Sequence, residues 1–214
     1  LFRILRTIRI VDDAIVMKES GIHAVEDYIM ARYQMYWQVY LHPVSRSYES
    51  ILSSIFKRMG EVEPVHLKGA EDLLPFLSKS EFTLEQFINL DESTVLVAFS
   101  KLTKSTDPIL KDLSRRILDR DLFEYENLNQ NTDIDKIKKR VIEAGYDPSY
   151  YVVKDYMSQI LYKPYEAYEN AGLSVLKDDG EVVELSHASN VVRGFVQGKK
   201  KEDRKIFFPK IRED

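Results

Sequence analysis

The stretch from Gly21 to Ser45, GIHAVEDYIMARYQMYWQVYLHPVS, predicts one long helix with a charge on its apolar face. Apolar and aromatic residues recur there at helical spacing and form one stripe: Val25, Tyr28, Ile29, Tyr36, Val39 and Tyr40. Arg32 lies in the middle of this stripe. A guanidinium stays charged, so a buried Arg32 needs a carboxylate, a phosphate or an aqueous cleft beside it. The partner of Arg32 therefore determines what this helix does.

Two interpretations of Arg32 are open from the sequence. In the structural one, it pairs with an Asp or Glu of another helix, or stacks on Tyr28 one turn away. In the functional one, Tyr36 and Tyr40 matter because they follow Arg32 at helical steps and stay near its face. A guanidinium can grip a phosphate with two prongs, and a tyrosine ring can lie against a sugar or base. These side chains would then form half of a nucleotide site.

The composition is that of an ordinary globular protein and limits the kinds of partner. The 214 residues include 44% hydrophobic side chains, enough to bury a sizeable core, and the net charge is −4. This acidity argues against a protein that coats nucleic acid, so any anion-binding site must be local. The chain has no cysteine, which excludes disulfides and thiol nucleophiles and favours a cytoplasmic location.

No apolar run approaches the roughly 18 residues of a membrane-spanning helix, and no signal-peptide pattern opens the chain. The chain begins without Met, directly on a helix-like spacing of Leu1, Leu5 and Ile8. We therefore expect no membrane partner, and we expect the chain to be a piece of a longer protein.

Helical patterns dominate up to residue 121, and β-forming residues become frequent from Leu122 onward. Pro43 should end the long helix, Ser45 or Ser47 should cap the next one, and Gly60 should stop it. The sequence predicts a mainly α fold, with a helical portion over residues 1–121 and a smaller α+β region over residues 122–214. Further expected elements are a helix end over 1–7, a hairpin turning at Asp12 and Asp13, helices within 68–102, one from Pro108, one ending at Gly145, a hairpin around Gly180, a last helix in SHASNVVRGFV, a solvated loop in GKKKEDRK and a final strand in IFFPK.

Residue patterns that carry catalysis on their own are missing from the sequence. The histidines show no metal-ligand spacing, and no His-Asp dipeptide occurs. The sequence also has no Walker loop, GxSxG elbow or glycine-rich phosphate loop. We therefore expect neither a self-sufficient catalytic centre nor a metal site in this chain.

Two segments, GIHAVEDYIMARYQMYWQVYLHPVSRSYES and STDPILKDLSRRILDRDLFEYENL, resemble the region after the catalytic core of HD-domain phosphohydrolases. Within that family they resemble the deoxynucleoside triphosphate (dNTP) triphosphohydrolases, which include bacterial dGTPase-like enzymes. The resemblance implies a helical HD-type enzyme that splits a dNTP into deoxynucleoside and triphosphate, using a metal-bound water or hydroxide. It also places the ligands of a divalent metal ion, including a His-Asp pair, upstream of Leu1. This chain alone should therefore be inactive.

The resemblance also implies roles for single residues. Arg32 falls where the family has an arginine that grips the substrate's phosphates, and Tyr40 falls on a tyrosine that lies against the sugar. Leu41 replaces a glutamine that some members use near the base. Four residues fall at or near the family's regulatory nucleotide site: Arg3, Lys18, His42 and Arg120. In that site, Glu124 and Pro43 each replace a lysine, so the effector need not be the same.

The implied partners are a dNTP substrate, a nucleotide effector bound between subunits, and further copies of the chain in a homo-oligomer, expected to be a tetramer. Two other functions stay open. One is a non-catalytic nucleotide-sensing or oligomerisation module whose HD partner has degenerated. The other is binding of single-stranded nucleic acid through basic and aromatic residues, against which the net acidity argues. Intact metal ligands upstream would favour the enzyme over the sensing module.

Overall fold

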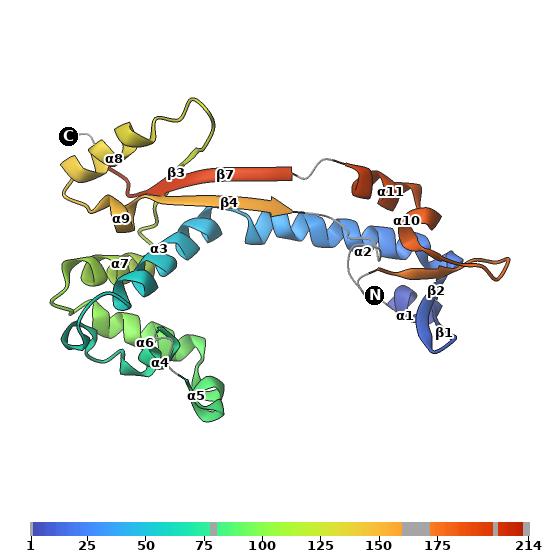
Figure 1. Cartoon of the computed structure of the whole chain (residues 1–214), viewed down its shortest axis with the longest axis horizontal. Helices are drawn as coiled ribbons and strands as arrows, with labels where there is room; N and C mark the ends of the chain where they lie inside the picture. The colour runs from blue at the N-terminus through green and yellow to red at the C-terminus, as the bar shows by residue number, and fades with distance from the viewer. Residues whose placement is uncertain (1, 78–80, 160–171, 199–200, 212–214) are drawn as a thin grey trace. The chain divides into compact units, whose positions relative to one another are not determined.

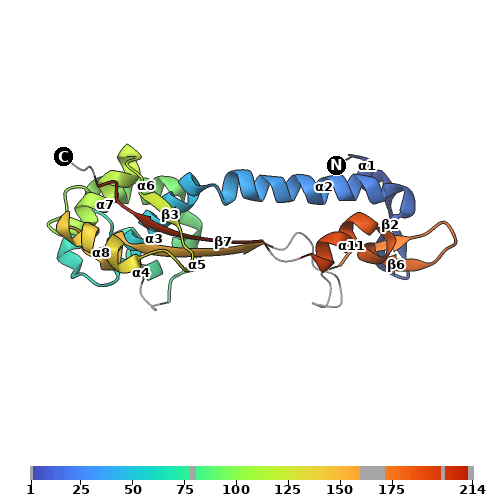
Figure 2. The same cartoon turned by 90° about the horizontal axis from the view of Figure 1, so that it is seen from above.

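A computed structural model describes residues 2–77, 81–159, 172–198 and 201–211 and divides the chain into two compact units (Figures 1 and 2). Unit 1 comprises Leu1–Leu41 and Met157–Asp203, and unit 2 comprises His42–Tyr156 and Arg204–Asp214. The units do not follow the predicted change at residue 122, because strands far apart in the sequence pair with each other. The elements are mainly helices with a four-stranded and a three-stranded sheet, as predicted for the fold class.

Unit 1 is built around a small sheet of strand order β1-β2-β5-β6. The turn between β1 and β2 places Asp12 and Asp13 at positive φ, 47° and 61°, which confirms the predicted hairpin. Strand β5 then adds to β2 in parallel, and β6 pairs antiparallel with β5. The elements of unit 1 are α1 (Phe2–Thr7), β1 (Ile8–Val11), β2 (Ala14–Lys18), a 3-10 turn (Glu19–Gly21), α2 (Ile22–Met35), a π-helical turn (Tyr36–Tyr40), β5 (Ser174–Leu176), β6 (Val182–Glu184), α10 (Leu185–Ala188) and α11 (Asn190–Gln197).

The core of unit 1 forms where the first turns of α2 meet the sheet, α10 and α11. Its buried members are Met17, Ile22, Val25, Ile29, Val175, Leu185 and Val192. Gly21 makes the entry into α2 possible, because a Cβ there would lie 2.4 Å from Thr7 Oγ1. The hydrophobic anchoring of α2 therefore involves its first turns.

Unit 2 packs α3 against α7, and α7 against α6, over a large apolar core. Its three-stranded sheet has the order β3-β7-β4. Strand β3 pairs antiparallel with β7. Units 1 and 2 both contain parts of β4 and β7. The remaining elements are α3 (Pro43–Met59), 3-10 turns (Pro64–Leu67 and Glu71–Leu73), α4 (Leu74–Leu77), α5 (Leu84–Asn89), α6 (Glu92–Leu102), α7 (Pro108–Asp119), β3 (Glu124–Asn127), α8 (Ile134–Glu143), α9 (Pro148–Tyr151), β4 (Val153–Gln159) and β7 (Lys201–Phe208).

Several predicted helix ends are confirmed, but the predicted capping residues at the start of α3 are wrong. Gly60 is the C-cap of α3, and α7 begins at Pro108 as predicted. Asp107 caps α7 by accepting a hydrogen bond from Leu110 N. Neither Ser45 nor Ser47 caps α3. Instead Pro43 is its first residue, and His42 Nδ1 accepts a hydrogen bond from Val44 N at 3.3 Å. Proline suits this position because the first helical N–H has no intrahelical partner.

Two stretches differ from their predicted structure. The segment KEDRK, predicted within a solvated loop, belongs to β7, and Lys205 in it is buried. The long helix leaves regular α geometry at Tyr36 and continues as the π-helical turn. Among the described residues, no helix combines the length and apolarity needed to cross a membrane.

Candidate functional site

The last turn of α2 and the π-helical turn after it present a row of three side chains, Arg32, Tyr36 and Tyr40, which we call the arginine–tyrosine row. The guanidinium carbon of Arg32 lies over the Tyr36 ring, 5.6 Å from its centroid. The Tyr36 and Tyr40 ring centroids are 5.2 Å apart, and the rings are tilted by 46°. The row therefore places a cation and two aromatic faces next to one another along one helix.

The surroundings of Arg32 correct the prediction that it sits on a buried face. Val25 and Ile29 are buried, but Arg32 is exposed, and Tyr28 and Tyr40 keep 51% and 52% of their surface accessible. The apolar stripe is buried only in the first turns of α2. Because its second half faces outward, Arg32 carries no penalty for an enclosed charge.

The structural interpretation of Arg32 is not what the geometry shows. Within the described parts of the chain, no carboxylate forms an ion pair with Arg32, and the ring that it lies over belongs to Tyr36 rather than to Tyr28. The pKa of Arg32 is raised above its ordinary value, chiefly by hydrogen bonding with the Tyr36 side chain and by electrostatic attraction to it. The guanidinium thus remains available for an external anion.

The π-helical turn sets where Tyr40 lies, and no residue pattern predicts this turn. Leu41 N donates to Tyr36 O at 2.7 Å, a bond that spans five residues instead of the four of an α-helix. Such wide turns occur often at functional sites. The turn ends at Tyr40, the residue that the family resemblance assigns to the sugar.

The predicted regulatory residues divide between the two units. Arg3 on α1 and Lys18 at the end of β2 are exposed in unit 1. His42 and Arg120 belong to unit 2, where His42 also has a structural role as the cap of α3. Arg120 is the left-handed residue that ends α7, with φ 55°. All four side chains are exposed, so each can contact solvent or another molecule.

A cavity of about 700 Å³ lies beside Arg120, between α3, α6 and α7. Its lining is largely apolar, and its charged members are Glu49, Glu92 and Arg120. With one cation against two carboxylates, these lining residues do not make a complete site for a triphosphate. An effector at Arg120 would need further cations from another part of the protein.

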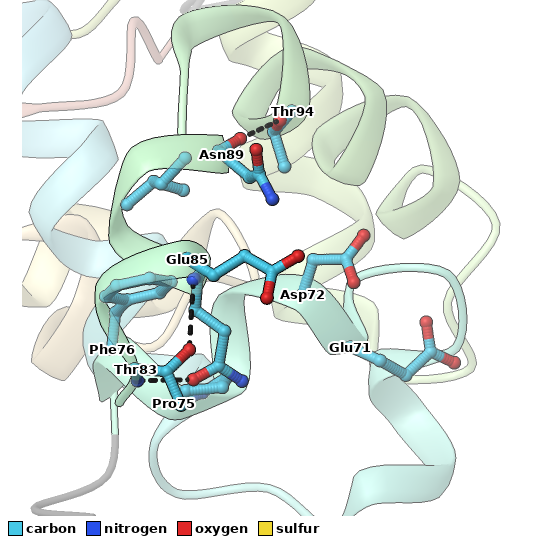
Figure 3. Close-up of a pocket in the computed structure, with 10 residues that line it drawn as sticks. Glu71, Asp72, Pro75, Phe76, Thr83, Glu85, Asn89 and Thr94 are labelled. Carbon is cyan, nitrogen blue, oxygen red and sulfur yellow. Dashed lines mark hydrogen bonds between the residues drawn. The ribbon is translucent and has the colours of Figure 1, made fainter. Parts of the chain in front are cut away.

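A second cavity, of about 400 Å³, has the wrong charge for a phosphate (Figure 3). Glu71, Asp72 and Glu85 line it, and no Lys or Arg is among its lining residues. One wall is held by a capping box in which Thr83 N donates to Gln86 Oε1 at 2.8 Å, while Gln86 N donates to Thr83 Oγ1 at 3.1 Å. A polyanionic substrate would be repelled here.

The described residues do not form a metal centre. Across residues 2–77, 81–159, 172–198 and 201–211, no cluster of three or more His, Asp or Glu side chains is arranged to hold a metal ion. His66, for example, pairs with Thr106 Oγ1 at 2.7 Å rather than with a carboxylate. A catalytic metal does not fit the side chains described here.

Arg115, Arg116 and Arg120 form one basic run in the sequence, but the structure gives them different surroundings. Arg116 is buried and bonds to Asp112, Asp121 and Tyr146. Asp112 lies four residues before Arg116, so the sequence already indicates an i,i+4 ion pair between them. Arg120 alone of the run lines the cavity of α3, α6 and α7.

Comparisons with known proteins now bear on this geometry. A family model described as "HD associated region" matches residues 1–208. The chain belongs to the HD-associated region family. This family assignment agrees with the predicted resemblance to the region that accompanies an HD domain.

Relatives of this HD-associated region are longer than the chain. The uncharacterized protein YwfO of Bacillus subtilis is 42% identical over 216 residues, which cover 97% of the chain and 50% of that protein. A phosphohydrolase from Bacteroides thetaiotaomicron has a similar structure, with a TM-score of 0.80, 27% identity, and coverage of 97% of this chain and 55% of that chain. The chain thus spans about half the length of each.

A hypothetical protein from Aquifex aeolicus shares the fold, with a TM-score of 0.62 at 22% identity over 97% of this chain and 47% of that one. The HD-associated region therefore adopts the fold of one half of a known phosphohydrolase.

Proposed function

We propose that the chain is part of a metal-dependent dNTP triphosphohydrolase, to which it supplies contacts for the substrate's phosphates and sugar. The observation that carries this proposal is the arginine–tyrosine row. Arg32 is exposed, and no carboxylate within the described chain neutralises it. Membership of the HD-associated region family and likeness to a phosphohydrolase support a hydrolase setting.

The chemistry of the row suits a nucleotide. The planar guanidinium of Arg32 can donate two parallel hydrogen bonds to phosphate oxygens and can stabilise charge that builds up on them. The ring of Tyr40, 52% exposed, offers an apolar face to a deoxyribose. These residues bind and orient the substrate, whereas activation of water falls to a divalent metal ion held outside the described residues.

The apolar surface around the row supports the proposal that a catalytic domain covers it. Tyr28, Met35 and Val39 lie on the same helix and are exposed, Val39 by 54%. Grouped aromatic and aliphatic side chains of this kind mark an interaction surface. We propose that the HD domain of the longer protein covers this face of α2 and encloses the substrate against Arg32.

The test is hydrolysis by the full-length protein. Each dNTP is supplied with Mg²⁺ or Mn²⁺, and the products are separated to distinguish triphosphate from pyrophosphate and orthophosphate. We expect triphosphate and deoxynucleoside, and Arg32→Ala should lower kcat/KM by about 30- to 150-fold, the scale of a lost charge-assisted contact of about 2–3 kcal/mol. Arg115→Ala, an exposed arginine outside the row, is the matched control. Nucleotide binding without hydrolysis would favour the sensing module.

We further propose a regulatory nucleotide site that uses Arg3, Lys18, His42 and Arg120 in a homo-oligomer, most simply a tetramer. Arginines that meet across subunits repel unless an anion lies between them, so nucleotide binding and assembly should be coupled in both directions. Sedimentation of the full-length protein should show assembly that tightens with added dNTP. Arg120→Glu should abolish that response while basal turnover continues. A distribution unchanged by saturating dNTP would contradict the coupling.

A further inference from the structure

Tyr36 is the central member of the arginine–tyrosine row. One side of its ring faces the Arg32 guanidinium at 5.6 Å, and its other neighbour is the Tyr40 ring at 5.2 Å. Tyr36 is half-buried, whereas Arg32 and Tyr40 are exposed. It therefore contacts both proposed substrate-binding residues from a more enclosed position than either.

We propose that Tyr36 is a positioning residue, whose ring holds the Arg32 guanidinium and the Tyr40 ring in the placement that a nucleotide requires. This inference rests on the proposed function of the row. An exposed arginine samples many rotamers, and ordering it at the moment of binding costs entropy. A ring that the guanidinium already lies over reduces this cost, because part of the ordering is done before the substrate arrives.

The π-helical turn supports the same role for Tyr36. In an α-helix, a residue and the fourth residue after it are offset by about 40° around the axis. A π-helical turn has a smaller angular step per residue, so it changes this offset. The turn begins at Tyr36 and ends at Tyr40, and the bond from Leu41 N to Tyr36 O closes it. The wide turn thus sets where Tyr40 lies around the helix relative to Tyr36, in the position where the two rings are in contact.

Tyr33 offers a matched control on the same helix. Its ring makes an edge contact with Trp37 at 6.1 Å between centroids, outside the row. A general loss of aromatic packing on α2 should affect Tyr33→Leu and Tyr36→Leu alike. A positioning role for Tyr36 predicts that the two variants differ.

The experiment measures dNTP hydrolysis by the full-length protein carrying Tyr36→Leu, Tyr36→Phe or Tyr33→Leu. We expect Tyr36→Leu to lower kcat/KM about tenfold, and Tyr36→Phe, which keeps the ring, to stay within about threefold of the parent. Tyr33→Leu should leave kcat/KM unchanged. In an Arg32→Ala background, Tyr36→Leu should cost less than it does in the parent, because only the placement of the Tyr40 ring is then left to lose.

The outcomes separate this inference from the proposed function. If the parent hydrolyses dNTPs and Arg32→Ala impairs it, while Tyr36→Leu matches the parent, the positioning role is overturned and the function stands. Equal losses from Tyr36→Leu and Tyr33→Leu would likewise overturn it, as would full additivity with Arg32→Ala. A parent that neither binds nor hydrolyses dNTPs would overturn both.

Discussion

One arginine from each compact unit shows two different surroundings for a guanidinium. In unit 2, Arg46 is buried and paired: it has 1% of its surface exposed, and Arg46 Nε donates to Asp155 Oδ2 at 2.5 Å. In unit 1, Arg32 stays outside and lies over an aromatic ring instead of a carboxylate. An arginine whose partner is already in place stabilises the fold, whereas one without a carboxylate partner can take a ligand. The following changes test that difference, in order of expected effect.

The largest effect on stability should come from Arg46→Ala. Removing Arg46 leaves Asp155 without its ion pair and opens a cavity beside Phe207, so the free energy of unfolding should fall by about 3 kcal/mol. Urea denaturation followed by circular dichroism measures this loss. Arg115→Ala, which breaks an exposed pair with Asp112, should cost less than about 1 kcal/mol. Equal losses from the two variants would show that burying and pairing Arg46 adds no more stability than an exposed ion pair does.

A matched pair of valines compares the two apolar cores. Val141 in unit 2 and Val175 in unit 1 are both fully buried. Val141→Ala should lower the free energy of unfolding by about 2 kcal/mol, and Val175→Ala by about half as much, because a small core collapses more readily around a cavity. Trp37, the single tryptophan, belongs to unit 1 and reports on it by fluorescence, while circular dichroism reports on both units.

The acid sensitivity of unit 2 should depend on Asp107. Burial alone would raise its pKa, but hydrogen bonds from Arg58 and Leu110 N, with the charge of Arg58, hold the pKa below its ordinary value. The stabilisation is therefore present above the unfolded pKa, near 3.8, and is lost as the pH falls through the lower folded value. Asp107→Asn keeps a helix cap but removes the charge.

This variant should cost about 1–2 kcal/mol at neutral pH and flatten the loss of stability below about pH 4. Urea midpoints measured from pH 2 to pH 7 would show it. A parent and variant with parallel pH profiles would show that another carboxyl group controls acid unfolding.

The smallest effect on stability should come from Arg32→Ala, although its effect on catalysis should be large. Since Arg32 is exposed and forms no ion pair within the described chain, the free energy of unfolding should change by less than about 0.5 kcal/mol. Thermal unfolding of the parent and the variant measures this. A variant that melts early while it keeps its activity per folded molecule would return Arg32 to a structural role.

The sequence predicted the elements better than their partners. The hairpin at Asp12 and Asp13, the end of α3 at Gly60 and the start of α7 at Pro108 follow from local chemistry, which a few neighbouring residues decide. The burial of Lys205 in β7 does not, because it depends on pairing with Asn127 of β3, far away in the sequence. The outward face of α2 beyond Ile29 was missed for a similar reason: spacing shows that a stripe exists but not what covers it.

For the candidate site, the sequence put Arg32, Tyr36 and Tyr40 on one face, and the structure brings them into contact. The π-helical turn was beyond prediction, since no residue type in YWQVY demands it. The sequence also could not show that His42 caps α3, because histidine is not among the favoured capping residues.

The parallel pairing of β2 with β5 has a consequence for the order in which the chain folds. Met17 lies opposite Val175, so the β1–β2 hairpin meets its neighbour strand only after the residues up to Leu176 have been synthesised. In unit 2, β3 likewise waits for β7. Contacts of such long sequence separation close slowly and leave strand edges open meanwhile. In a ribosome-bound chain that ends before residue 174, the edge of β2 that pairs with β5 should therefore have no partner strand, and it should be accessible to proteases and chaperones.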